Sequence, residues 1–174
     1  MGGVIISGVH GVGKGTFITQ LEKCNMEILV LSASNLISNY HNPEDSGYKK
    51  VKDVAANQKL LVDEIKKQTD NLMIDYVLDG HISLINAHNQ IETIPEGFFV
   101  NADIKRIVLI QDEPLMIEKR LKQRDGRSLS VEVIKRIQEI ELEYSESLSK
   151  KYEMDLYVIK DEKTKAEFFK NMHK

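Results

Sequence analysis

Residues 8–16 read Gly-Val-His-Gly-Val-Gly-Lys-Gly-Thr, and this stretch decides the fold. It follows a short apolar run at residues 4–7 and leads into residues 16–23, which have the composition of a helix. A strand, a turn carrying G-x-x-x-x-G-K and a helix, in that order, are typical of a phosphate-binding loop. Glycines let backbone N–H groups converge on an anion, and the helix start adds partial positive charge. The sequence therefore predicts a phosphate site at this turn.

Different residues of this loop are expected to contact different parts of a bound nucleoside triphosphate and its Mg²⁺ ion. Lys14 can bridge the β- and γ-phosphates, and Thr16 can help to hold Mg²⁺, directly or through water. A glycine-rich turn can also serve tight packing, but packing does not require a lysine inside the turn. The following residues are expected to contact phosphates: Gly11, Val12, Gly13, Lys14, Gly15 and Thr16.

The rest of the chain alternates short apolar segments with longer stretches of helix formers. Strands are expected at residues 4–7, 27–31, 74–79, 106–110 and 156–160. Helices are expected at residues 16–23, 51–67, 113–122 and 131–151, where apolar residues recur three and four apart. Residues 42–50 and 80–101 are expected to form long loops. The predicted fold class is α/β, a three-layer P-loop NTPase fold with a five-stranded parallel sheet flanked by helices.

Length and composition limit the class of protein. A chain of 174 residues suits one domain, 1–174, and 41% hydrophobic with 29% charged residues suits a globular fold. The net charge of -3 does not favour binding to nucleic acid. No apolar run approaches the roughly 20 residues of a membrane span. Together with the single cysteine, Cys24, and the lack of a signal peptide pattern, this favours the cytoplasm and no membrane partner. Nothing in the sequence indicates an oligomeric state.

A second site feature is the acidic end of the strand expected at residues 74–79. Asp79 ends this strand and is followed by Gly80 and His81. A carboxylate in this place is typical of the second phosphate-site motif of P-loop proteins, so Asp79 is expected to hold Mg²⁺ through water. His81 either hydrogen-bonds a loop carbonyl or orients Asp79, a phosphate or a water molecule.

The arginines are concentrated in the second half of the chain, four of them within residues 120–136. Arg120, Arg124 and Arg127 recur at spacings of four and three, so a helix would place them on one side. Such a cluster repels itself unless an anion is present, although a solvated basic face is the alternative. Arg136, on the next predicted helix, either returns to the same phosphates or stays solvated.

These motifs together resemble the nucleoside-monophosphate kinase family. Adenylate kinases carry G-x-P-G-x-G-K-G-T in the same place, and here His10 stands where they have proline. The Asp-x-His form of residues 79–81 is similar to the archaeal-type adenylate kinases and their nuclear eukaryotic relatives, which have both kinase and ATPase activity. The resemblance covers most of the chain. It implies Mg²⁺ and ATP as cofactor and donor, with AMP as the favoured acceptor.

The resemblance also implies roles for individual residues. Arg120 would pack on the adenine, while Arg124 and Arg127 would stabilise the transferring phosphoryl group. Residues 125–128 are too few for the large lid of long kinases, so a short lid at about 120–136 is expected. With Lys14 and Asp79, Arg124 and Arg127 complete the expected catalytic set.

The acceptor side carries a weaker pattern, because residues 1–105 contain no arginine. Classical adenylate kinases have D-G-F-P-R at the position of Asp79-Gly80, and their arginine grips the acceptor phosphate. Here an acceptor-side insertion at about 32–70 is expected to supply Ser34 and Asn35, together with His81. Further candidates lie nearby: Ser32 after the second strand, Lys49, Lys50 and Lys52 for charge, and Asn57 and Gln58 for a base edge unless they lie on a solvated helix face.

Four functions stay open at this point. The first is phosphoryl transfer from Mg²⁺-ATP to a nucleoside monophosphate or a similar small acceptor. The second is an ATPase whose acceptor is water, with His81 placing that water. The third is a nucleotide-gated binding module for a macromolecular partner. The fourth is a kinase acting on a non-nucleotide or on a nucleic acid end, which the acidic net charge disfavours.

Overall fold

The computed structural model describes residues 2–24, 28–38, 54–69, 75–86, 88–126 and 129–171. Within these ranges a five-stranded sheet has the order β2-β3-β1-β6-β7, and every pairing in it is parallel. All five predicted strands are therefore confirmed, as is the fold class. The strands are β1 (Gly3–Ser7), β2 (Leu29–Ser32), β3 (Tyr76–Asp79), β6 (Ile104–Ile110) and β7 (Asp155–Ile159).

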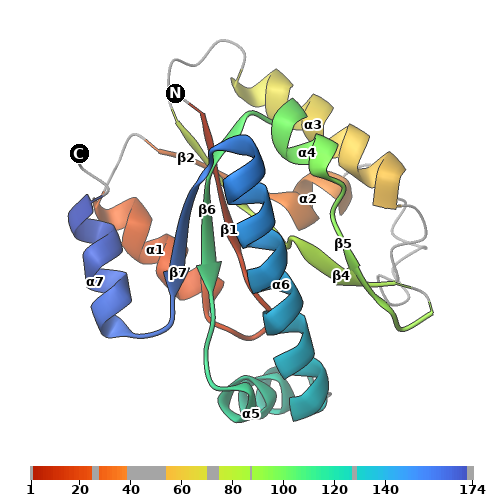
Figure 1. Ribbon diagram of the computed structural model, residues 1–174, viewed down its shortest axis with the longest axis vertical. Helices are drawn as coiled ribbons and strands as arrows, with labels where there is room; N and C mark the ends of the chain where they lie inside the picture. The colour runs from red at the N-terminus through yellow and green to blue at the C-terminus, as the bar shows by residue number, and fades with distance from the viewer. Residues whose placement is uncertain are drawn as a thin grey trace.

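Helices cover both faces of this sheet. Figure 1 shows α1 and α7 on one face, and α3, α4 and α6 on the other, with α5 at one end of the sheet. The four predicted helices are confirmed as α1 (Lys14–Cys24), α3 (Val54–Thr69), α5 (Pro114–Asp125) and α6 (Val131–Tyr152). Three shorter helices were not predicted: α2 (Ala33–Ser38), α4 (Glu96–Asn101) and α7 (Glu162–Asn171).

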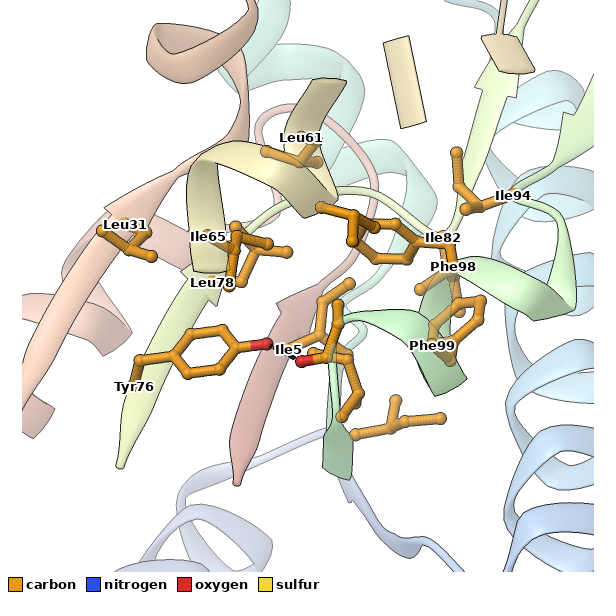
Figure 2. Close-up of a cluster of buried hydrophobic side chains, with 14 of the residues drawn as sticks. Ile5, Leu31, Leu61, Ile65, Tyr76, Leu78, Ile82, Ile94, Phe98 and Phe99 are labelled. Atoms are coloured by element: carbon orange, nitrogen blue, oxygen red, sulfur yellow. Dashed lines mark hydrogen bonds between the residues drawn. The ribbon is translucent and has the colours of Figure 1, made fainter. Parts of the chain in front are cut away.

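The strands are apolar on both faces because each face packs against helices. Ile5 and Leu78 belong to the core shared with α3 and α4, whereas the neighbouring Ile6 and Val77 belong to the core shared with α1. Figure 2 shows the first of these cores, where Phe99 of α4 is fully buried. In the same core the Tyr76 hydroxyl donates a hydrogen bond to the Ala102 carbonyl.

The prediction of a long loop at residues 80–101 is wrong. It holds an antiparallel hairpin of β4 (Ser83–Ile85) and β5 (Ile91–Thr93), followed by α4. Asn86 closes the hairpin, because its Oδ1 accepts hydrogen bonds from the backbone N–H groups of His88 at 2.9 Å and Gln90 at 3.0 Å. Three-residue strands are too short to show alternation, so the composition of the segment, with Pro95, Gly97 and several asparagines, indicated a loop instead.

The loop expected at residues 42–50 lies outside the described residues. Gly126 ends α5 at a φ of 64°, and Ser130 begins α6 by accepting a hydrogen bond from the Val133 backbone N–H at 3.3 Å. Among the described helices, none combines the length and apolarity needed to cross a membrane.

Candidate phosphate-binding site

The glycine-rich loop joins β1 to α1 at the carboxyl edge of the sheet. Gly8, Gly11 and Gly13 have φ values of 148°, 82° and 108°, in the region that favours glycine. A Cβ on Gly8 would lie 2.4 Å from the Ile110 carbonyl oxygen, so the loop passes close to the end of β6. At Gly13 and Gly15 a Cβ would meet no described atom within 4 Å. The loop is therefore packed on its inner side and open on its outer side, where an anion would bind.

Gly8→Ala is expected to destabilise the fold by about 1–3 kcal/mol or more, because it combines an unfavourable φ with a contact to a backbone oxygen that cannot move away. Chemical denaturation monitored by circular dichroism measures the free energy of unfolding. Gly15→Ala is the matched control, since it adds the same methyl group in open space within α1. Equal stabilities for the two variants would contradict the packing described for Gly8.

Lys14 lies at the centre of the site. Its Nζ donates a hydrogen bond to the Gly8 carbonyl at 3.0 Å and lies 3.4 Å from His81 Nε2. Burial lowers the pKa of Lys14, the charges of Asp79 and Glu141 raise this pKa, and the charge of Arg124 lowers it. Asp79 and Arg124, two further predicted catalytic residues, are thus both close enough to Lys14 to act on its charge.

Asp79 ends β3 directly beside β1, in register with Ile6. Burial raises the pKa of this carboxyl group, and the charge of Lys14 lowers it. Because the carboxyl ends of parallel strands meet at one edge, Asp79 and the glycine-rich loop share the same side of the sheet. This is the placement that the strand-then-carboxylate pattern predicted.

His81 lies against Lys14 and packs on the His10 ring, with the ring centroids 4.2 Å apart and the planes tilted by 45°. Burial, followed by the charges of Lys14 and His10, holds the pKa of His81 well below its ordinary value, while a hydrogen bond with the Gly8 backbone acts the other way. At neutral pH the ring is therefore uncharged. The first interpretation of His81 is met, because the ring bonds the Gly8 backbone. Its position beside the Lys14 amine is compatible with orienting a phosphate or a water molecule, which stays a prediction.

Arg120 is held against the backbone of the loop, on the side that faces α5. One Nη lies 2.5 Å from Asp112 Oδ2, and the other donates to the Gly11 carbonyl at 3.3 Å and the Val12 carbonyl at 3.5 Å. Asp112 is fixed in turn by Gln138 of α6, whose side chain accepts from the Asp112 backbone N–H and donates to its carbonyl, both at 3.0 Å. Sequence reasoning found Arg120 but missed Asp112 and Gln138.

The other arginines differ in placement. Arg124, on the last turn of α5, is exposed and close enough to Lys14 to lower its pKa. Arg127 lies outside the described residues. Arg136 pairs with Glu139 at 3.4 Å, and 60% of its side chain is exposed. This placement of Arg136 favours the solvated alternative.

Of the predicted acceptor residues, those that follow β2 lie on the side of Asp79 away from β1. Ser32 ends β2 in register with Asp79, and its hydroxyl accepts a hydrogen bond from the Asn35 backbone N–H at 3.4 Å. Ser34, whose hydroxyl lies 3.1 Å from that of Ser32, and Asn35 are exposed at the start of α2. Gln58 of α3 is buried, and no described residue hydrogen-bonds its Oε1, so a solvated helix face is wrong for Gln58. The candidates Lys49, Lys50 and Lys52 lie outside the described residues.

Sequence reasoning missed a buried carboxylate behind the loop. Glu141 of α6 is 1% exposed, and its Oε1 accepts hydrogen bonds from the hydroxyls of Ser7 at 3.4 Å and Ser83 at 3.1 Å. Burial raises the pKa of Glu141 to about 7, against the opposing effects of Ser83, Lys14 and Ser7. One signal was available, because Glu141 lies four residues after Ile137 on the apolar stripe of the helix predicted at 131–151.

The residues predicted to hold Mg²⁺ fit that ion in type. The Thr16 hydroxyl, exposed on the first turn of α1, and the Asp79 carboxylate are the oxygen ligands that Mg²⁺ prefers. Among the described residues no group of three or more His, Cys, Asp or Glu gathers to hold a metal. Mg²⁺ at this site would therefore take most of its ligands from water and phosphate, as it commonly does.

The parallel sheet in the order β2-β3-β1-β6-β7, with a phosphate-type loop after β1, defines a P-loop NTPase fold. A family model described as "AAA domain" matches residues 7–138, and the chain belongs to this family. No curated protein matches the sequence.

Solved structures with this fold include two kinases. A gluconokinase from Sinorhizobium meliloti 1021 is 12% identical, with 99% of this chain and 95% of that chain covered at a TM-score of 0.54. A deoxyadenosine kinase from M. mycoides with bound dATP is 16% identical, with 99% of both chains covered at a TM-score of 0.55. At these identities the similarity establishes the fold.

Proposed function

We propose that the protein is a kinase that transfers a phosphoryl group from Mg²⁺-ATP to a small acceptor. The observation that carries the proposal is the arrangement around Lys14. Its amine lies inside a glycine-rich loop that is open on its outer side, next to the Asp79 carboxylate and the uncharged His81. This arrangement suits an amine that binds phosphate oxygens.

The chemistry follows from position and charge. Phosphoryl transfer needs no strong protein nucleophile, since stabilising charge on the moving oxygens supplies most of the catalysis. Lys14 would hold the β- and γ-phosphates, and Arg124 would approach the transferred group from the end of α5. Mg²⁺ held through Thr16, Asp79 and water would neutralise further phosphate charge. Arg127, by resemblance to the adenylate kinases, would join Arg124.

The donor nucleotide would lie along the α5 side of the loop. Arg120 is already positioned there by Asp112 and two loop carbonyls, with its planar guanidinium available to an adenine. The acceptor would bind on the β2 side, near Ser34, Asn35 and His81. Its identity is open, because AMP rests on the resemblance to archaeal-type adenylate kinases alone, and the two similar kinases are named for other acceptors.

The proposal is tested by incubating the protein with Mg²⁺-ATP and one acceptor at a time, and separating the products by chromatography. The acceptors are the nucleoside monophosphates, the deoxynucleosides and gluconate. A phosphorylated acceptor formed together with ADP is expected for one class, and this product identifies the substrate. Mg²⁺-ATP binding without turnover on any acceptor or on water would contradict the proposal and favour a nucleotide-gated binding module.

A second candidate is an ATPase whose acceptor is water, and the placement of His81 favours it. An uncharged imidazole beside Lys14 can orient a water molecule near the γ-phosphate. For this activity, ADP and phosphate form at a rate that no added acceptor changes, and His81→Ala lowers that rate by about 10²-fold or more.

The pH dependence gives an independent test of the state of His81. Because its pKa is held well below 6.5, the ring stays uncharged as the pH falls from 8 to 6.5. The activity lost in His81→Ala is therefore expected to be constant over this range. The difference in activity between the wild type and His81→Ala should decrease only at lower pH, where the ring gains a proton. A decline centred near pH 6.5 would mean that the ring is exposed to water, contrary to the burial described.

A further inference from the structure

Hydrogen bonds to Glu141 and to the Ser7 hydroxyl connect α6 with two segments of the phosphate site. Glu141 Oε1 accepts hydrogen bonds from Ser7 at the end of β1 and from Ser83 at the start of β4. The Ser7 hydroxyl also accepts a hydrogen bond from the Ile82 backbone N–H at 3.0 Å. The three residues Ser7, Ser83 and Glu141 are buried.

The two connected segments are the end of β1 and residues 80–83, and they adjoin the residues proposed to act on phosphate. Ser7 directly precedes the glycine-rich loop, and Ile82 directly follows His81. The backbone of the intervening turn is further fixed because the Gly80 N–H donates to the Ile6 carbonyl at 3.2 Å. A shift of residues 80–83 would therefore move both Asp79 and His81 relative to Lys14.

We propose that Glu141 is a positioning residue for the phosphate site, holding residues 80–83 against the start of the glycine-rich loop and so fixing Asp79 and His81 relative to Lys14. Through its kinetic readouts this inference rests on the proposed kinase function. It adds α6, whose first residues overlap the expected lid, to the elements that determine the geometry of the site.

Packing alone does not account for a carboxylate in this place. Burying a carboxyl group disfavours its charged form, and an apolar side chain of similar size would fill the space without that penalty. No described residue hydrogen-bonds Glu141 Oε2 or the Ser145 hydroxyl one turn further along α6. The groups that bond or act on Glu141 are Ser7 from β1, Ser83 from β4 and the Lys14 charge from α1.

The stability of the variants follows from the same burial. Burial raises the pKa of Glu141 from 4.5 to about 7, so the folded protein binds this proton more tightly than the unfolded chain. The contribution of Glu141 to the free energy of unfolding therefore falls as the pH rises from 4.5 to 7. At pH 8, where the carboxylate is charged and buried, Glu141→Gln is expected to melt at the same temperature as the wild type or higher.

The test compares Glu141→Leu, Glu141→Gln and the control Glu143→Gln, an exposed carboxylate on the same helix. The leucine variant is expected to lose about 10- to 100-fold in kcat with little change in the KM for ATP, because the reacting groups are misplaced while the outer face of the loop is intact. The glutamine oxygen accepts from both serines, so Glu141→Gln should restore most of the kcat. A folded leucine variant with wild-type kcat overturns the proposal, and so does a glutamine variant as slow as leucine.

Ser83→Ala keeps the proposal testable where the leucine variant does not fold. It removes one donor and leaves the carboxylate, so kcat is expected to fall. The pKa of Glu141, followed by ¹³C NMR of labelled glutamate carboxyl groups, should rise, because the Ser83 hydroxyl lowers this pKa. An unchanged pKa together with wild-type kcat overturns the inference.

Backbone amide spectra separate this inference from the proposed function. Where the wild type turns over no acceptor and no water, the kinase proposal fails, but Ser83→Ala should still shift the amide resonances of residues 79–82 and of the glycine-rich loop. Unshifted resonances in both segments would overturn the positioning role by itself.

Discussion

Lys14→Ala is expected to lower turnover of Mg²⁺-ATP by about 10²- to 10³-fold or more, as removal of a central charge-stabilising donor does in other enzymes. The lysine amine is the group that the loop, Asp79 and His81 all contact or influence, and residues 8–16 contain no other lysine or arginine. The melting temperature should change little, because burial disfavours the charged amine and its loss removes that penalty. Steady-state release of ADP and thermal denaturation measure the two effects.

Lys23→Ala is the matched control for this variant. Lys23 lies on the same helix, α1, but is exposed near the end remote from the loop. Its turnover should equal that of the wild type. Near-normal turnover in Lys14→Ala would contradict the assignment of the loop as the phosphate site.

Asp79→Asn is expected to lower kcat by about 10²-fold and to raise the Mg²⁺ concentration needed for half-maximal rate. The substitution keeps the size of the side chain but removes the charge that opposes Lys14 and that would hold Mg²⁺ through water. It also removes the largest influence that raises the pKa of Lys14, so this amine becomes easier to deprotonate. The measurement is initial rate against Mg²⁺ concentration at fixed ATP.

The control for this second variant is Asp75→Asn, just before β3. Asp75 is exposed, and its Oδ1 accepts a hydrogen bond from the Gly2 backbone N–H at 3.0 Å, remote from the carboxyl edge of the sheet. Its Mg²⁺ dependence should match that of the wild type. An Asp79→Asn enzyme with wild-type Mg²⁺ dependence would mean that this carboxylate has no part in metal binding.

Local patterns explain why the sheet and the loop could be predicted. The central strands are buried on both faces and read as continuous apolar runs, and the glycines around Lys14 mark the turn between strand and helix. The β4–β5 hairpin was missed because three residues per strand give no period, and its turn residues look like a loop. The helix α2 has six residues, which is too short for helical spacing to emerge.

A residue of the candidate site could be predicted only where its position in the local sequence pattern indicated its role. Lys14 and Asp79 follow from strand ends, and Arg120 follows from helical spacing. Gln138 and Glu141 act through contacts between α6 and segments far away in sequence, such as Asp112 and Ser83. Their polar side chains on a predicted apolar stripe were the visible sign, but the partner of each depends on how α6 packs on the sheet.

The central claim is that residues 8–16 hold the phosphates of ATP, and amide NMR tests it most directly. Mg²⁺-ATP is titrated into ¹⁵N-labelled protein, with Lys14→Ala as the comparison. The largest shifts are expected at the backbone N–H groups of residues 11–16, with smaller shifts at Asp79 and His81, and Lys14→Ala should weaken them all. Binding that leaves residues 11–16 unshifted while other amides move would contradict the account.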